Sequence, residues 1–321
     1  MIKLSNGYGF TFMTASGALG FDGEGYVYDW PFIKRGWLDR RQFLIVLKTI
    51  TREPRVGNRR WYDWLGRGCV RFLPDGLVNA VGLTNPGIEH WCQAVAPRLA
   101  DPRLRLVFSL QGTPDEVAQI AEHLAGAISQ RHLTNIKAVE LNASCPNVQS
   151  GMGHIGEIWR SLFALQNTLS TLPRLLKISA AHEPDLAELV RVADDLVEAY
   201  SLNSVPWAMA FPGEPSPFER YNGWGQGGVS GRAAQRVNWR IIQELRILTK
   251  RPVIGSDPWS YNDVVKLLNC YKVGAVSFGA IHLPNPLKPW TWGRPAYPTH
   301  WVKCWQRENS DSKTKGEKSD H

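Results

Sequence analysis

Eight short apolar runs recur along this chain of 321 residues, and they restrict its fold more than any other feature. Each run is almost continuously apolar, which is typical of strands buried on both faces of a parallel sheet. The predicted strands cover residues 43–47, 77–81, 104–110, 136–141, 175–178, 196–202, 252–254 and 275–278. The pattern therefore predicts a largely parallel sheet of eight strands.

Helical segments are predicted between several of these strands. Thr113 is a good helix cap because Pro114 and two acidic residues, Asp115 and Glu116, follow it, and this helix should run to about Arg131. Further helices are predicted at residues 183–194, 233–250 and 260–270. Alternation of eight strands with helices favours an α/β fold, the (β/α)8 TIM barrel, and an open doubly wound sheet is the alternative.

Two segments interrupt the alternation of strands and helices. Residues 51–76 are rich in Arg and Trp, and residues 205–228 are rich in Pro and Gly. Each follows a predicted strand, so both should be insertions at the C-terminal face of the barrel, where the active sites of such barrels lie. The length fits one barrel with insertions, so we expect a single domain over residues 1–306. Residues 307–321 are polar and are expected to form a disordered tail.

Charge and cysteine content limit the partners of the chain. The net charge is +8, but the Arg-rich segment carries no aromatic-interleaved motif, so we expect no nucleic-acid partner. The five cysteines show neither CxxC nor metal-type spacing, which indicates free thiols, no metal site and a reducing compartment. The first residues lack the apolar core of a signal peptide, and no apolar run approaches membrane-spanning length. We therefore expect a cytoplasmic protein without membrane contact.

Polar residues gather at the ends of the predicted strands. Lys48 and Lys177 stand out, because a lysine at the end of an apolar strand needs a partner if it is buried. Since the parallel strands of a barrel end at the same face, these residues are expected to converge on one site. The candidates are Lys48, Thr49, Asn79, Asn142, Cys145, Asn147, Lys177, Asn203 and Ser204.

The turn after the fourth predicted strand, residues 142–147, carries the most informative chemistry. It places two carboxamides, Asn142 and Asn147, beside one thiol, Cys145. An inert buried thiol is the ordinary interpretation of a single cysteine. A thiolate can, however, remove a proton, and carboxamides can pair with a planar ring that carries donors and acceptors. The combination suggests chemistry on a heterocycle.

Six short motifs occur in order along the chain and together resemble one family. They lie at residues 48–58, 79–87, 142–147, 176–177, 203–204 and 227–231. This pattern is similar to that of the dihydroorotate dehydrogenases, in particular the class 1 enzymes, whose base is a cysteine. The resemblance covers roughly residues 15–283, and six ordered motifs are far more specific than any one of them.

The resemblance implies an FMN-dependent barrel that oxidises dihydroorotate to orotate in pyrimidine biosynthesis. Cys145 would take the proton from C5 of the substrate, while the C6 hydride passes to the flavin. The residues implied in substrate binding are Lys48, Asn79, Val81, Gly82, Leu83, Asn142, Asn147, Asn203 and Ser204. Those implied in cofactor binding are Ser16, Lys48, Thr49, Asn142, Lys177, Leu202, Gly228, Ser256, Asp257, Gly279 and Ala280.

The chain departs from the family pattern where the FMN phosphate is expected. Asp257 and Pro258 stand in place of a Gly pair, so one amide donor is lost and a carboxylate is expected near a phosphate. Ala280 lacks the hydroxyl that usually follows the last strand. We therefore expect a weakened or altered phosphate site, in which Ser256 and Arg232 help.

Other functions stay open at this point. One alternative is a flavin oxidoreductase acting on another dihydropyrimidine, and a second is a degenerate, flavin-free barrel with a binding role, which the Asp257–Pro258 change would favour. The electron acceptor could be fumarate, a quinone, or NAD through an electron-transfer partner subunit, and residues 82–87 lean toward the NAD-linked type. The aromatic C-terminal region could also pack on a second copy in a homodimer.

Overall fold

The computed structural model describes residues 1–58, 68–99, 101–143, 155–221 and 223–292. Its central sheet has eight parallel strands in the order β3-β14-β13-β10-β9-β8-β7-β4. A parallel bridge between Met13 and Leu44 joins the two end strands, so the sheet closes into a (β/α)8 barrel, as predicted. The strands are β3 (Phe12–Thr14), β4 (Ile45–Val46), β7 (Leu106–Leu110), β8 (Ile136–Asn142), β9 (Arg174–Ile178), β10 (Ala199–Leu202), β13 (Val253–Gly255) and β14 (Ala275–Phe278).

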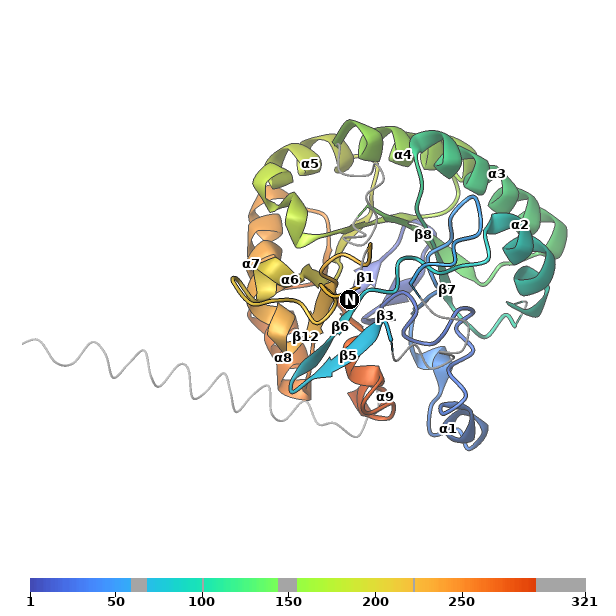
Figure 1. Cartoon of the computed structure of the whole chain (residues 1–321). Helices are drawn as coiled ribbons and strands as arrows, with labels where there is room; N and C mark the ends of the chain where they lie inside the picture. The colour runs from blue at the N-terminus through green and yellow to red at the C-terminus, as the bar shows by residue number, and fades with distance from the viewer. Residues whose placement is uncertain (59–67, 100, 144–154, 222, 293–321) are drawn as a thin grey trace, which may run out of the picture.

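Helices surround this barrel (Figure 1). The surrounding helices are α2 (Ile88–His90), α3 (Pro114–Arg131), α4 (Ile155–Thr168), α5 (Leu186–Ala193), α7 (Arg232–Leu248) and α8 (Tyr261–Asn269), and three shorter ones are α1 (Trp30–Lys34), α6 (Trp207–Ala210) and α9 (Lys288–Trp292). The predicted cap of α3 is confirmed, since Thr113 accepts a hydrogen bond from the Glu116 N–H in a capping box. Within the described residues, no helix is long and apolar enough to cross a membrane.

The predicted helix starts differ in accuracy. Helices α7 and α8 begin within one residue of their predicted starts. The helix predicted from residue 183 begins later, as α5 at Leu186, because a 3-10 turn capped by Ser179 (η4, Ala180–Asp185) comes first. Pro184 lies inside that turn and removes one backbone donor, which favours a short turn over a continuous α-helix there.

One predicted barrel strand is wrong. Residues 77–81 mostly form β6 (Gly76–Asn79), which lies in a separate sheet with β5 (Val70–Leu73), β11 (Val205–Pro206) and β12 (Gly228–Gly231) in the order β11-β12-β6-β5. The eighth barrel strand is instead β3, whose three residues are too few to show an apolar run. The two interrupting segments, predicted as insertions, contribute β5 and β11 to this antiparallel second sheet, and β12 begins at the last residue of the second segment.

The inside of the barrel is apolar toward its N-terminal end. Alternate residues of the strands form one hydrophobic cluster there, and Ile2, Leu4 and Phe10 of the N-terminal segment belong to it. Ile2 and Phe10 lie in the hairpin of β1 (Ile2–Lys3) and β2 (Gly9–Phe10), which therefore plugs this end. The barrel residues of the cluster are Met13, Leu44, Val46, Val107, Ala138, Leu175, Ala199, Ile254 and Ala275.

Candidate active site

The barrel interior becomes polar two residues beyond the apolar cluster. Successive side chains of a strand alternate between faces, so the second residue after each cluster member again faces inward, nearer the carboxyl end. We call the polar members of this set, apart from Lys48 at the barrel mouth, the polar layer. Its members are Ser109, Glu140, Lys177, Ser201, Ser256 and Ser277. Carboxyl ends of barrel strands are where catalytic groups are positioned, so the polar layer marks the candidate active site.

An ion pair lies within the polar layer. Lys177 Nζ is 2.7 Å from Glu140 Oε1, and the two side chains are 8% and 2% exposed. Glu140 Oε1 also accepts a hydrogen bond from Ser109 Oγ (2.9 Å), and Oε2 accepts one from Ser201 Oγ (3.4 Å). A buried charge is tolerated when it is paired and hydrogen-bonded in this way. Lys177 thus has the partner that its position in an apolar strand demanded.

Glu140 was not predicted as a site residue. It lies in an apolar run and is almost completely buried. The signal that could have identified it is its spacing, two residues after Ala138 and two before Asn142, which places all three on the inner face of one strand.

Hydroxyl groups connect this ion pair to the end of β8. Thr49 Oγ1 is 3.0 Å from Ser109 Oγ, and Asn142 Nδ2 donates to Thr49 Oγ1 at 3.2 Å. Ser16 Oγ lies 3.1 Å from the same Thr49 oxygen. Four predicted residues, Ser16, Thr49, Asn142 and Lys177, are therefore brought together in one network, which is buried except at Ser16.

Lys48 lies at the same end of the barrel, two residues after the inward-facing Val46. Its aliphatic stem packs beside Gly17, since a Cβ built at Gly17 would lie 3.1 Å from Lys48 Cδ. Gly17 also has a φ of +79°, which other residues rarely adopt. The glycine therefore leaves room for Lys48 at the mouth of the barrel.

The second sheet carries the predicted residues around Asn79. Asn79 pairs with Gly228 across β6 and β12, and its Nδ2 donates to the Gly228 carbonyl at 3.3 Å. After β6 the chain turns through Gly82 and Leu83, with φ of +71° and +57°. A non-glycine residue in this region is strained and needs surrounding structure to hold it.

Asn85 provides that support. Its Oδ1 accepts from the N–H groups of Thr51 (3.2 Å) and Gly87 (2.9 Å). Its Nδ2 donates to Thr51 Oγ1 (2.9 Å) and to the Leu83 carbonyl (2.7 Å). Asn85 thus ties the segment after β4 to the turn that contains Val81–Leu83, a role that the sequence motif alone did not reveal.

Asn203 and Ser204 follow β10 directly. The Asn203 N–H donates to the Ile178 carbonyl (2.8 Å), and its own carbonyl accepts from Asn238 Nδ2 (2.9 Å).

Leu202 differs from its neighbours, because its side chain belongs to the cluster between strands and helices. Only the Leu202 backbone could therefore contact a cofactor in the barrel mouth.

Asp257 directs its carboxylate at the start of α7. Oδ1 accepts from the Gly231 N–H at 2.9 Å, and Oδ2 accepts from Asn238 Nδ2 at 2.7 Å. Burial raises the pKa of the Asp257 carboxyl, while hydrogen bonds from Asn238 and Gly231 oppose that rise. The carboxylate that the sequence placed near a phosphate thus has protein donors of its own.

The end of β14 approaches β3 closely. A Cβ built at Gly279 would lie 2.8 Å from the Cβ of Ala15, so a larger residue would collide there. Ala280 begins the 3-10 turn that follows (η5, Ala280–His282). The end of β14 therefore presents backbone rather than long side chains.

Cys145 and Asn147 lie outside the described residues. The described chain reaches Ala143, directly after Asn142 at the carboxyl end of β8. Within the described residues, no group of three or more His, Cys, Asp or Glu could hold a metal ion.

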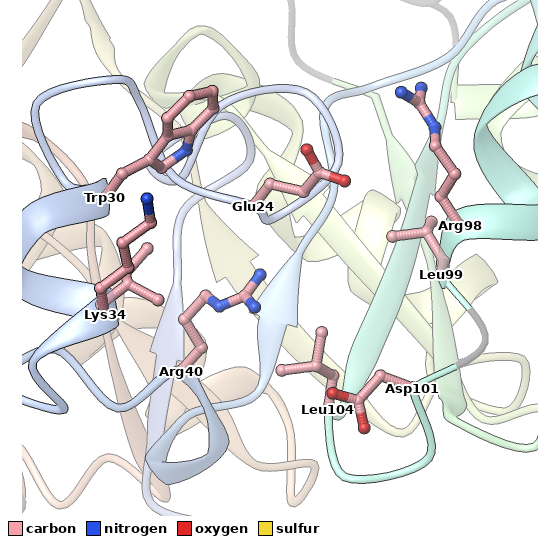
Figure 2. A pocket seen from close by; sticks show the side chains of 9 residues that line it. Glu24, Trp30, Lys34, Arg40, Arg98, Leu99, Asp101 and Leu104 are labelled. Atoms are coloured by element: carbon pink, nitrogen blue, oxygen red, sulfur yellow. The ribbon is translucent and has the colours of Figure 1, made fainter.

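A separate surface cavity of about 330 Å³ lies between α1 and the segment that leads into β7. Figure 2 shows Trp30 and Lys34 on one side, Arg98 on the other, and the guanidinium of Arg40 directed into the space. None of the predicted site residues lines it, and Asp101 at its base is paired with Arg103 (2.9 Å). This cavity is therefore distinct from the candidate active site.

Comparisons with known proteins agree with the geometry. The family model for dihydroorotate dehydrogenase matches residues 8–258. The dihydroorotate dehydrogenase B (NAD(+)) catalytic subunit of Geobacillus sp. (strain WCH70) is 28% identical over 281 residues, 85% of this chain and 82% of that protein. The subunit of the same name from Listeria monocytogenes serotype 4a (strain HCC23) is also 28% identical over 281 residues, 85% of this chain and 84% of that protein. The crystal structure of TcOYE with pHBA aligns with a TM-score of 0.50 and 13% identity over 93% of this chain and 98% of that one, which is a likeness of fold.

Proposed function

The chain belongs to the dihydroorotate dehydrogenase family, and we propose that it oxidises (S)-dihydroorotate to orotate in pyrimidine biosynthesis. The family makes it an oxidoreductase acting on a CH–CH group. The observation that carries the proposal is the hydrogen-bond network that joins Lys177 of the polar layer to Asn142 at the carboxyl end of the barrel.

Enzymes of this family are flavin-dependent, and we propose FMN as the cofactor. The residues present fit such a group. Lys177 offers a buried cation, and Gln111 Oε1, at the end of β7, is buried without a hydrogen-bond partner among the described residues. The close approach of Gly279 and Ala15 leaves backbone at the strand ends. A planar, anionic ligand with N–H donors matches this set.

The chain's own residues have the following proposed roles. FMN, when bound, supplies the acceptor for the substrate hydride. Lys177 with Ser16, Thr49 and the backbone of Leu202 and Gly228 would hold the flavin. The substrate carboxylate and ring would be held by side chains and one stretch of backbone. These are Lys48, Asn79, Asn142, Asn147, Asn203, Ser204 and the backbone of Val81–Leu83. Cys145 would take the proton from C5 as the general base.

The phosphate contacts are proposed to come from backbone amides at the ends of β13 and β14, near Ser256, Asp257, Gly279 and Ala280, with help from Arg232. Support comes from the hydrogen bonds that Asp257 makes with Gly231 and Asn238, which turn its charge toward protein donors. Pro258 still offers no N–H. We therefore expect FMN to be held less tightly than a site with a Gly pair would hold it.

The electron acceptor is proposed to be NAD, reached through an electron-transfer partner subunit. The names of the B-type relatives as NAD(+) catalytic subunits support this, as do residues 82–87. The acceptor is tested by supplying fumarate or a quinone to the purified chain, which should support no turnover because NAD is reached only through the partner subunit. Turnover with fumarate would contradict the NAD assignment.

We further propose a cytoplasmic homodimer of this chain.

The proposed function is tested by the visible absorption spectrum and by product analysis. We expect bound flavin near one per chain and orotate from dihydroorotate. Cys145→Ala should abolish orotate formation, by at least a hundredfold for loss of a general base, while flavin stays bound. Oxidation of dihydrouracil instead of dihydroorotate would favour the other dihydropyrimidine activity. A colourless protein that binds no added FMN would favour the flavin-free barrel.

A further inference from the structure

Glu140 is the acidic partner of the cation that the proposed function assigns to the flavin. We propose that Glu140 is a positioning residue, which orients Lys177, offsets its charge and thereby sets how readily the bound flavin is reduced. The proposal rests on the proposed function, because it requires flavin in the barrel mouth. No role was assigned to Glu140 by the family motifs, and it is the ion pair in the structure that identifies it.

The contacts of Glu140 support an orienting role. Its Oε1 holds the Lys177 ammonium at 2.7 Å from the neighbouring strand, and the side chains are 2% and 8% exposed. Among the described residues, no other hydrogen bond of Lys177 Nζ is recorded, so two of its three donors remain for a ligand. A flexible lysine is thereby held by one fixed acceptor.

The same carboxylate determines the direction of the hydroxyl chain. An ionised carboxylate only accepts hydrogen bonds, so Ser109 must donate to Glu140. Ser109 has one proton, so Thr49 is the donor in its contact with Ser109, and Thr49 Oγ1 accepts from Asn142 Nδ2. Ser16 donates to the Leu47 carbonyl, so it competes with Ser109 for the Thr49 proton. Glu140 therefore also orders the amide of Asn142, which is proposed to contact both flavin and substrate.

Charge balance gives the proposal its direction. With Glu140 ionised, the pair carries no net charge. Glu140→Gln leaves the Lys177 cation uncompensated, and a nearby positive charge favours the anionic reduced flavin. Lys177→Met leaves the Glu140 carboxylate without its cation, and a nearby negative charge disfavours the anionic reduced flavin. Removing both charges in Glu140→Gln/Lys177→Met restores a neutral site.

The experiment measures the midpoint potential of bound flavin in wild type and in these three variants. In Glu140→Gln we expect the affinity for reduced flavin, relative to that for oxidised flavin, to rise on the order of tenfold. This corresponds to a midpoint potential about 30 mV higher for two electrons. The double variant should return to within about threefold of wild type. Ser201→Ala, which removes an uncharged neighbour 3.4 Å from Glu140, is the matched control and should shift the ratio less than about threefold.

Each outcome separates the inference from the proposed function. Wild type without flavin overturns the proposed function, and the inference with it. If Glu140→Gln binds flavin and its midpoint potential is unchanged, the inference is overturned and the proposed function is not. A loss of thermal stability at unchanged potential would then identify a merely structural role for Glu140. Should Glu140→Gln fail to fold, the comparison of Lys177→Met with the double variant decides: the double variant must bind reduced flavin relatively more tightly, and equality overturns the inference.

Discussion

Glu140 and Lys177 lie on neighbouring strands, and each explains how the other can be buried in the barrel. Removing one partner of a buried pair typically costs about 3–5 kcal/mol, because the remaining charge has no compensation. The alternation of Ala138, Glu140 and Asn142 with outward-facing residues places Glu140 inside the barrel, although it was not among the predicted site residues. It could not show that Glu140 and Lys177 meet, because their contact depends on how two strands are set against each other.

At the residue scale, Gly17 tests the placement of Lys48. Gly17→Ala should displace the Lys48 stem, which lies 3.1 Å from the new Cβ, and raise KM for dihydroorotate about tenfold. Gly36→Ala is the matched control, because Gly36 has a similar φ of +70° but nothing lies within 4 Å of the added Cβ. Both variants should lose about 1 kcal/mol of unfolding free energy from backbone strain. Equal KM values in the two variants would refute the role of Lys48.

Asp257 predicts a pH dependence of stability. Its pKa is raised by burial, so the folded chain binds the proton more tightly than the unfolded chain. Its contribution to stability is therefore largest at low pH and falls as pH rises from 3.8 through the folded pKa. Asp257→Asn removes this loss, so its unfolding free energy minus that of wild type should increase with pH in urea titrations.

Asp101 provides a control of opposite sign. Hydrogen bonds from Arg103 lower the pKa of Asp101 to about 2, so its stabilisation is present above pH 3.8 and is lost as pH falls toward 2. The unfolding free energy of Asp101→Asn minus that of wild type should therefore decrease as pH rises. If this difference in unfolding free energy changed with pH in the same direction for Asp257→Asn and Asp101→Asn, the two assignments would be contradicted.

At the scale of elements, the turn after β6 depends on Asn85. Asn85→Ala removes four hydrogen bonds, two of them to Thr51 and one to the strained Leu83. We expect a loss of about 2–3 kcal/mol in unfolding free energy. KM for dihydroorotate should rise at least about threefold, because Val81–Leu83 would no longer be held in place.

Thr113→Ala is the control for this prediction. It removes the cap of α3, which should cost about 1 kcal/mol without changing KM. A change in KM of similar size in both variants would show that the effect of Asn85 is only a general loss of stability.

At the scale of the whole molecule, the barrel has two different ends. The N-terminal hairpin closes one end with apolar side chains, and the polar layer lies toward the other. Phe10→Ala should therefore lower the unfolding free energy by about 3–5 kcal/mol and leave the flavin spectrum and KM of the folded protein unchanged.

Val27→Ala serves as the comparison, since Val27 is 57% exposed and its substitution should change stability by less than about 0.5 kcal/mol. A shifted flavin spectrum in Phe10→Ala would mean that the two ends of the barrel are coupled.

The sequence by itself determined the alternation of strands and helices, the cap of α3 and the strand ends at which the polar candidates lie. These features depend on local spacing, because burial repeats every second residue in a strand and caps involve neighbours three residues apart. The carboxyl-end location of Lys48, Asn142 and Lys177 followed from the same rule.

Only the tertiary structure decided which segment completes the barrel, which partner Lys177 has and where Asp257 points. Closure selected the three residues of β3 over the more apolar β6, which pairs instead with β5 and β12. Asp257 meets Gly231 and Asn238, and Lys177 meets Glu140. These contacts join residues 19 to 37 positions apart, so they exist only once the strands and helices have packed, and no local pattern encodes them.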